Sequence, residues 1–314
     1  AQRRLRQEII KRYADHERTH PDFVHGLAKE IELLRDSDEG HDVHDTIVQK
    51  TDDTRPSILA VGDIFTDAFI KLNDNEARVT KDDDGKEWLA VQFGAKMPYD
   101  AVDVVSSVGP SPNAAVSFSR LGVKSGLQAF LGDDEVGKES LRYLASEHVD
   151  TSTIRPEAGA KSSYWYVLRY GADRTMLVKN ESYKYEWVSP EAAPNWLYLS
   201  QISDKAWPLH EEILTYLEAH PDTKLAFQPG TSQLRWGADK LAAIYRRSSI
   251  VVMNREEAMD VTGKPYDSVR ELANALHELG PNIVVITDGP KGSYASYDYK
   301  FVTIPNYPDP AAPF

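Results

Sequence analysis

The sequence predicts an α/β protein with a doubly wound, mostly parallel sheet, helices on both faces and a small β lid. From about residue 110 onward, strand-sized apolar runs alternate with helical segments, as expected for a parallel sheet covered by helices. Two stretches near residues 64–105 and 162–180 are polar and partly alternate in hydrophobicity. They do not suit buried parallel strands and predict a separate β lid.

The composition excludes several classes of protein and site. Asp and Glu outnumber Lys and Arg by 49 to 36 in 314 residues, giving a net charge of −13, which disfavours nucleic-acid binding. The absence of Cys excludes thiolate zinc sites and cysteine nucleophiles. The longest apolar runs, such as residues 250–253, are too short to span a bilayer. We therefore expect no membrane association and a cytoplasmic location.

Residues 1–55 differ from the rest of the chain. They are crowded with charge and carry narrow apolar stripes at helical spacing, such as Leu27, Ile31 and Leu34. They predict a helical N-terminal extension and linker, which is either a solvated segment or a surface for a partner. The pairs His41-Asp42 and His44-Asp45 in the linker leave open a metal-dependent hydrolase, although no further set of residues has ligand spacing.

Residues 56–314 form the predicted main domain. Its elements follow in order: a strand at 57–61, the lid strands within 64–105, a helix over 114–121, a strand at 127–131, a helix over 135–147, a lid hairpin within 162–180, a strand at 196–200, a helix over 208–219, a strand at 224–228, a helix over 238–246, a strand at 249–253, helices over 255–262 and 268–279, and a strand at 282–287. Ligands of such sheets bind beyond the carboxyl ends of the strands, so polar residues there are candidate site residues.

Two candidate groups follow the first half of the sheet. Asp63 and Asp67 come just after the first strand, where carboxylates can accept hydrogen bonds from vicinal sugar hydroxyls or simply shape a turn. Ser111 and Pro112 read as the N-cap and first residue of a helix. That reading places Gly109 and Asn113 at a helix mouth suited to a polar or anionic ligand.

Two further groups follow later strands. Asn254 and Glu257 have the spacing of a capping box, and their other reading is the organisation of Mg²⁺ and phosphate through water. Residues 287–292 read TDGPKG, in which successive backbone N–H groups can form an anion nest. The same residues are also an ordinary turn, and no Walker P-loop occurs in the chain.

In this order, the motifs resemble those of the ribokinase-like (PfkB-type) family of sugar and nucleoside kinases, from about Ser57 to Pro305. The opening strand carries G-x-x-x-x-D at Gly62 to Asp67, and a variant of the first signature is present as Val108, Gly109 and Asn113. The later matches are LGDDEVGK at residues 131–138, HVD at residues 148–150, N-x-x-E at residues 254–257 and T-x-G-x-x-G at residues 287–292.

The resemblance implies ATP-dependent phosphorylation of a hydroxyl on a sugar or nucleoside. It implies the following roles: Asp63, Asp67, Gly109 and Asn113 bind the sugar; Tyr164 or Tyr166 of the lid covers it; Asn254 and Glu257 serve phosphate and Mg²⁺, Glu257 through water; Thr287, Asp288, Gly289 and Gly292 line the nucleotide site. Lids often pair in this family, which implies a homodimer.

Three departures from the family pattern matter. Val108 replaces the first signature glycine, and Gln228 stands where the family usually has an acidic residue or Asn before Pro. The second signature, D-T-x-G-A-G-D, is expected shortly after Pro305, where this chain reads NYPDPAAPF. We therefore expect a truncated sequence whose catalytic base, an Asp, lies beyond Phe314. The alternative is a non-catalytic sugar- or nucleotide-binding regulator or scaffold, with the N-terminal helices as its partner surface.

Overall fold

The computed structural model describes residues 57–265 and 268–306, which belong to one compact unit. The expected helical extension over residues 1–55, including the His-Asp pairs, lies outside the described residues.

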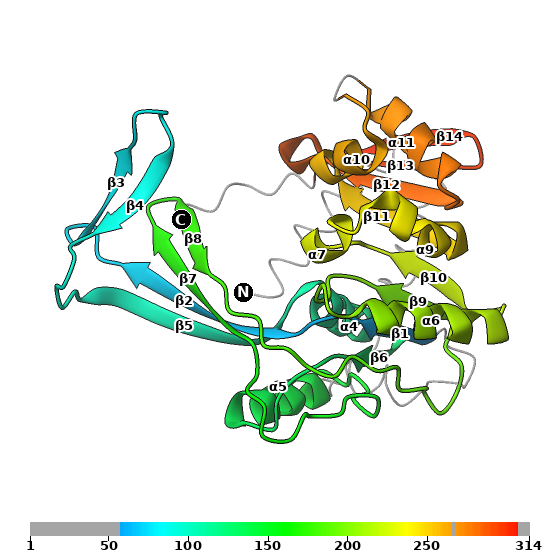
Figure 1. The fold of residues 1–314 in the computed structure, drawn as a ribbon, viewed down its shortest axis with the longest axis horizontal. Coiled ribbons are helices and arrows are strands. Elements are labelled where there is room, and N and C mark those ends of the chain that lie inside the picture. Colours follow the sequence, from blue (N-terminus) through cyan, green and yellow to red (C-terminus); the bar gives the residue numbers. More distant parts are fainter. Residues whose placement is uncertain (1–56, 266–267, 307–314) are drawn as a thin grey trace, which may run out of the picture. The chain divides into compact units, whose positions relative to one another are not determined.

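An eight-stranded sheet forms the centre, in the order β14-β13-β12-β11-β10-β9-β1-β6 (Figure 1). Its strands are β1 (Ser57–Val61), β6 (Lys124–Gln128), β9 (Trp196–Leu199), β10 (Lys224–Phe227), β11 (Ser248–Asn254), β12 (Ile283–Thr287), β13 (Ser293–Tyr297) and β14 (Lys300–Ile304).

The predicted mostly parallel sheet is confirmed. Strands β6, β1 and β9 to β12 run parallel, and β13 and β14 add an antiparallel edge. Apart from β6 (KSGLQ), the parallel strands are largely apolar, and they contribute buried residues to the core because helices cover them. Their carboxyl ends therefore meet along one edge of the sheet.

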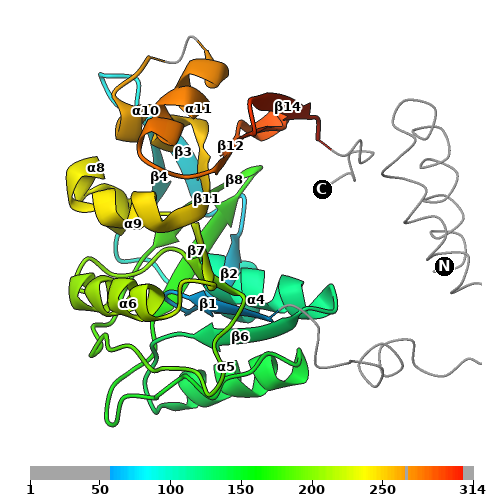
Figure 2. The same ribbon diagram turned by 90° about the vertical axis from the view of Figure 1, so that its right-hand side faces the viewer.

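Helices pack on both faces of this sheet (Figure 2). One apolar core joins β1 and β9–β12 to side chains from α6 (Trp207–Ala219), α9 (Ala242–Arg247), α10 (Arg255–Thr262) and α11 (Val269–Glu278). A second core joins β1 and β6 to α4 (Pro110–Arg120) and α5 (Glu135–Ser146). The short helices α7 (Thr231–Leu234) and α8 (Gly237–Lys240) follow β10. Among the described residues, no helix is long and apolar enough to cross a membrane.

A four-stranded sheet forms the lid expected from the polar stretches. Its order is β5-β2-β7-β8, from β2 (Phe65–Leu72), β5 (Tyr99–Val108), β7 (Tyr164–Tyr170) and β8 (Asp173–Leu177). The strands β3 (Ala77–Lys81) and β4 (Glu87–Val91) form a separate hairpin. The lid is continuous with the main sheet, because β2 follows β1 after three residues.

The start of α4 differs from the prediction. The helix begins at Pro110, with Gly109 at the N-cap position and no side-chain cap. Ser111 lies inside the helix, and its hydroxyl donates to the Val61 carbonyl (2.7 Å) and contacts Ser200 Oγ (2.6 Å). Tertiary contact with the ends of β1 and β9 therefore replaces the expected capping role of Ser111.

Candidate functional site

A cavity of about 470 Å³ lies where lid strands β2 and β7 meet the carboxyl ends of the main-sheet strands. The residues that line it are Phe65, Asp67, Phe69, Val108, Gly109, Pro110, Asn113, Trp165, Gln201, Gln228, Pro229, Gly230, Thr231 and Glu257. Four residues singled out from the sequence are among them: Asp67, Gly109, Asn113 and Glu257. The fold brings these four together from separate parts of the chain.

Asp67 is a buried carboxylate in this cavity. It lies on β2 opposite Trp165 of β7 and Val105 of β5, and its side chain is 9% exposed. Its Oδ1 atom is buried and has no hydrogen-bond partner in the described part of the chain. Burial raises the pKa of Asp67 above its ordinary value. A buried acceptor without a partner is costly, so Asp67 is suited to accept hydrogen bonds from ligand hydroxyls.

The mouth of α4 forms another wall of the cavity. Gly109 has φ = 129°, and a Cβ there would lie 3.0 Å from the Asp63 carbonyl oxygen and 3.3 Å from the Phe65 ring. Only glycine combines this backbone conformation with so close an approach. The Asn113 backbone N–H donates to the Gly109 carbonyl (3.0 Å), and its exposed side chain remains at the cavity.

Two glutamines in the cavity were not predicted as site residues. Gln201 and Gln228 follow the carboxyl ends of β9 and β10, and Tyr198 donates a hydrogen bond to Gln228 Oε1 (2.5 Å). A Cβ on Gly230 would lie 1.5 Å from Gln201 Oε1, so glycine leaves room for this amide. The strand-end rule applied to β9 and β10 would have found both glutamines.

The lid contributes Trp165 rather than the expected tyrosines. Successive residues of a strand face opposite sides, and Trp165 faces the cavity with its ring centroid 4.2 Å from that of Phe65. Tyr164 and Tyr166 line a different cavity of about 650 Å³, together with residues of β8 and the start of α5. Tyr164 and Tyr166 therefore do not line the cavity that contains Asp67.

Asp63 also lies elsewhere than expected. Its side chain is 6% exposed, but it does not line the cavity that contains Asp67. Burial raises its pKa to about 7, although the nearby Ser203 backbone N–H and Tyr185 hydroxyl favour the ionised form. Asp63 is thus a buried group of the lid junction and not a lining residue of the cavity.

Asn254 and Glu257 form the capping box at the start of α10. Asn254 Oδ1 accepts from the Glu257 backbone N–H (2.8 Å), and Glu257 Oε2 accepts from the Asn254 backbone N–H (2.8 Å). Burial raises the pKa of Glu257. Glu257 also lines the cavity, so one carboxylate serves the helix and faces a ligand space. A single carboxylate suits Mg²⁺, which keeps several of its waters, and Glu257 would hold the ion through one of them.

The predicted nucleotide residues after β12 lie next to this cap. Asn254 and Thr287 are register partners at the ends of β11 and β12, and Thr287 is exposed. Gly289 begins the 3₁₀ turn η1 (Gly289–Lys291). A Cβ on Gly292 would lie 2.3 Å from the Ile304 carbonyl oxygen, so this glycine is required by packing against β14.

Asp288 has a structural partner in this loop. Its Oδ2 accepts a hydrogen bond from Arg255 Nη1 of α10 (2.6 Å), and both side chains are about nine-tenths buried. Lys291 Nζ lies 3.8 Å from the same oxygen. These ion pairs fix the loop after β12 against the start of α10. Because its carboxylate is paired with Arg255 and lies near Lys291, Asp288 is less available to contact a nucleotide directly than the sequence predicted.

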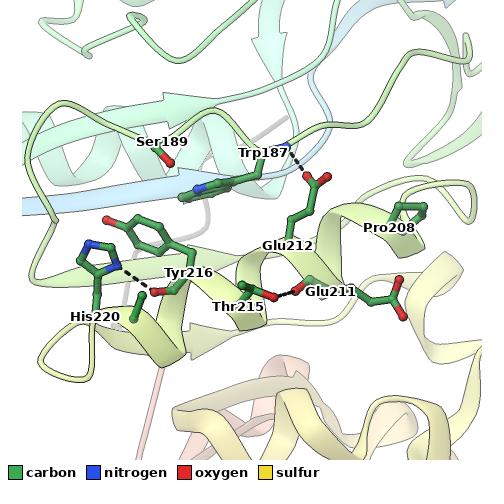
Figure 3. Close-up of a pocket in the computed structure, with 9 residues that line it drawn as sticks. Trp187, Ser189, Pro208, Glu211, Glu212, Thr215, Tyr216 and His220 are labelled. Carbon is green, nitrogen blue, oxygen red and sulfur yellow. Dashed lines mark hydrogen bonds between the residues drawn. The ribbon is translucent and has the colours of Figure 1, made fainter.

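A separate groove lies over α6, away from these residues. It has a volume of about 540 Å³ and is bordered by Trp187, Glu211, Glu212, Tyr216 and His220, among others (Figure 3). The Trp187 and Tyr216 rings lie 4.9 Å apart, and the Trp187 backbone N–H donates to Glu212 (2.6 Å). None of the residues singled out from the sequence lines it.

Known proteins resemble this chain in sequence and fold. Residues 92–310 match the pfkB family carbohydrate kinases. The chain is 27% identical to a fructokinase of Klebsiella pneumoniae over 208 residues, covering 60% of this chain and 65% of that protein. It is 28% identical to a 5-dehydro-2-deoxygluconokinase of Clostridium tetani over 209 residues, covering 60% and 61%.

A solved structure shares the fold. The Arabidopsis thaliana ribokinase complexed with ribose and ATP superposes with a TM-score of 0.62 at 16% identity, covering 80% of this chain and 78% of that chain. This likeness concerns the fold alone, whereas the family match spans more than half of the sequence. The chain belongs to the pfkB family of carbohydrate kinases.

Proposed function

We propose that this protein transfers the γ-phosphate of ATP to a hydroxyl of a sugar or nucleoside. Of these substrate classes, we propose a neutral sugar. The observation that carries the proposal is Asp67, a buried carboxylate whose Oδ1 has no partner among the described residues, in a cavity between the lid and the strand ends. An ionised carboxylate can accept hydrogen bonds from two vicinal hydroxyls. Aromatic rings and neutral amides form much of the remaining wall.

The charge of the cavity favours a neutral sugar over a sugar acid. Among the described lining residues, Asp67 and Glu257 are acidic, and none is Lys or Arg. Carboxylate recognition normally uses Arg or Lys, and a sugar acid would face two like charges here. A neutral polyol can instead use Asp67, Asn113 and the two glutamines as hydrogen-bonding groups.

In the proposed site each residue has a distinct task. Asp67 and Asn113 orient the sugar hydroxyls, and the Trp165 and Phe65 rings cover the C–H face of the sugar and exclude water. Asn254, Glu257 and Thr287 belong to the ATP side, with Asp288, Gly289 and Gly292 shaping the loop beside it. Mg²⁺ held near Glu257 through water would neutralise phosphate charge.

Two measurements test this function. Isothermal titration of the present chain with fructose, ribose, a nucleoside and gluconate measures substrate choice, and we expect a neutral sugar to bind and gluconate not to bind. A coupled ADP-release assay with the sugar that binds then measures transfer. We propose that the protein acts in the cytoplasm, where ATP is available. Gluconate binding in preference to every neutral ligand would contradict the proposed substrate class.

The non-catalytic alternative differs in the second measurement. A regulator or scaffold of this fold would bind the sugar but release no ADP with any substrate. Val108 and Gln228 depart from the family pattern. These departures support the non-catalytic alternative only if sugar binding persists without ADP release. Sugar binding together with sugar-dependent ADP release would remove it.

We further propose that the protein forms a homodimer through the lid. The register of the lid strands places Val102, Val104, Tyr166 and Leu177 on one face, opposite to that of Asp67. Each of these side chains is between 44% and 57% exposed. Contiguous exposed apolar side chains are typical of association surfaces, and a second lid presents the same apolar surface in return.

A further inference from the structure

The segment of residues 228–231, which joins β10 to α7, forms part of the wall of the cavity that contains Asp67. All four of its residues line the cavity. At its start, the Gln228 N–H donates to the Leu199 carbonyl at the end of β9 (2.9 Å). At its other end the segment leads into α7, where it is held by side chains that lie outside the cavity.

These side chains are His210 of α6 and Gln233 of α7. Both are fully buried, and neither lines the cavity. His210 Nδ1 lies 2.7 Å from the Ala206 carbonyl oxygen, and His210 Nε2 lies 3.0 Å from Gln233 Nε2. Gln233 Oε1 accepts from the Gly230 backbone N–H (2.8 Å). Three hydrogen bonds in series therefore connect α6 to the 228–231 segment, and we call the two side chains the His210–Gln233 bridge.

The two ends of this bridge fix the role of every group in it. The Ala206 carbonyl can only accept, so His210 Nδ1 carries a proton. The Gly230 N–H can only donate, so it faces the amide oxygen of Gln233, and the amide nitrogen donates to His210 Nε2. A turned-over amide would place donor against donor at one contact and acceptor against acceptor at the other. The bridge therefore has a single arrangement of donors and acceptors while His210 is neutral.

The surroundings of His210 favour the neutral ring. Its centroid lies 6.0 Å from that of Trp207 and 5.0 Å from that of Trp236. Lys240 Nζ lies 4.4 Å from the centroid of the Trp207 ring. Burial, and to a smaller extent the charge of Lys240, lowers the pKa of His210 to about 4. His210 Nε2 is therefore an acceptor at neutral pH.

We propose that His210 and Gln233 are positioning residues that hold the 228–231 segment in place for the sugar. Gly230 packs directly on Gln201, because a Cβ there would lie 1.5 Å from Gln201 Oε1. The position of the segment therefore sets the positions of both glutamines that line the cavity. Neither bridge residue lines it, so both act only through the segment. This inference rests on the proposed sugar site, because its effect on binding passes through these glutamines.

Two substitutions of His210 separate its two hydrogen bonds. Asparagine places its amide nitrogen near the position of Nδ1, so His210→Asn keeps the bond to Ala206 and loses the contact with Gln233. Glutamine places its amide oxygen near the position of Nε2, so His210→Gln keeps an acceptor for Gln233. Gln233→Met removes the bridge with little change of volume.

His220→Asn is the matched control. His220 is the C-cap of the same helix, and its Nδ1 lies 2.8 Å from the carbonyl oxygen of Tyr216, four residues earlier. His210 has the same relation to Ala206. His220 does not line the cavity, so its substitution removes an imidazole from α6 without touching the bridge.

Three measurements are made on each protein. Titration with fructose and with ribose measures affinity, hydrogen exchange of residues 228–234 measures how firmly the segment is held, and thermal unfolding measures stability. We expect His210→Asn and Gln233→Met to speed this exchange and to weaken sugar binding about tenfold, the effect of losing one buried hydrogen bond. His220→Asn should change neither.

Rescue by His210→Gln distinguishes positioning from a merely structural role. This variant loses the bond to Ala206 and should lower the Tm about as much as His210→Asn does. It should nevertheless keep slow exchange and nearly wild-type affinity, because it keeps the contact with Gln233. A merely structural role would give the two His210 variants the same affinity.

Nitrogen-15 NMR of the imidazole rings tests the arrangement directly. Near neutral pH the His210 ring should be neutral and protonated at Nδ1, and its signals are assigned by their absence from His210→Asn. A proton at Nε2 would contradict the bridge, because it would place that N–H against the amide nitrogen of Gln233.

Three results would overturn the inference. The first is equal sugar affinity of His210→Asn and His210→Gln. The second is unchanged exchange of residues 228–234 in His210→Asn, or in Gln233→Met if the His210 variants do not fold. The third is a His210 ring protonated at Nε2. If neither sugar binds the wild type, the proposed sugar site fails, while exchange and the nitrogen spectrum still decide whether the bridge holds the segment.

Discussion

Asp63 and Asp67 lie close together in the sequence, but the fold gives their carboxylates different surroundings. Asp67 is on β2 and lines the cavity, whereas Asp63 precedes β2 and does not line it. Both are buried, and burial raises both pKa values. We therefore expect the two carboxylates to differ in function, because Asp67 faces a cavity and Asp63 is buried outside it.

Replacing Asp67 with Asn should weaken sugar binding about 10- to 100-fold without unfolding the chain, because a neutral amide replaces a charged acceptor. Titration calorimetry measures the affinity, and circular dichroism checks the fold. Because the pKa of Asp67 is raised, wild-type affinity should fall on acidification at a higher pH than an ordinary aspartate would give. Asp67→Asn should lack this dependence.

The matched control for Asp67 is Asp100→Asn. Asp100 is an exposed residue of lid strand β5 that receives a hydrogen bond from Asn73 (2.9 Å). It does not line the cavity, so its loss should leave sugar affinity unchanged. Equal affinities of wild type and Asp67→Asn would refute the role proposed for Asp67.

At the scale of elements, the alternation of β7 decides which aromatic residue meets the ligand. Trp165→Ala should lower sugar affinity about tenfold through loss of its ring, which packs against Phe65, whereas Tyr164→Ala should not. Both variants delete one aromatic ring from the same strand, so each controls for the effect of the other on lid stability. A larger loss of affinity in Tyr164→Ala would restore the assignment made from the sequence.

The start of α10 should respond to loss of its cap. Asn254→Ala should lower the free energy of unfolding by about 1 kcal/mol and weaken Mg-ATP binding, because Glu257 loses its reciprocal bond. Asn254→Ser, which keeps a side-chain acceptor, should retain most of the stability. Chemical denaturation and nucleotide titration measure the two effects. Unchanged nucleotide affinity in Asn254→Ala would separate the cap from the ATP site.

At the scale of the whole molecule, the exposed lid face should control the oligomeric state. Val104→Asp places a charge on the apolar lid face and should convert a dimer, of twice 35.3 kDa, into a monomer. Light scattering coupled to size exclusion measures the mass. Val302→Asp is the control, because Val302 is 39% exposed and belongs to β14, an edge strand of the main sheet and not of the lid. A monomeric wild type would refute the lid dimer.

Much of the fold could be predicted from the sequence because its signals are local. The strands β9 to β12 are short apolar runs bounded by polar turns, α11 has a regular apolar stripe, and the capping box of α10 is written as Asn254 and Glu257. The lid hairpin at β7 and β8 alternates in hydrophobicity. These patterns depend on residues a few positions apart, so one sequence was enough to place them.

The details of the site depended on tertiary contacts that local patterns do not contain. Whether Trp165 or Tyr164 faces the cavity depends on which side of β7 turns toward the main sheet. The room for Gln201 depends on Gly230, which comes from another segment of the chain. The sequence by itself determined the elements, their order and the region of the site. Only the tertiary structure decided which side chains share the cavity, because that choice is made by packing between distant segments.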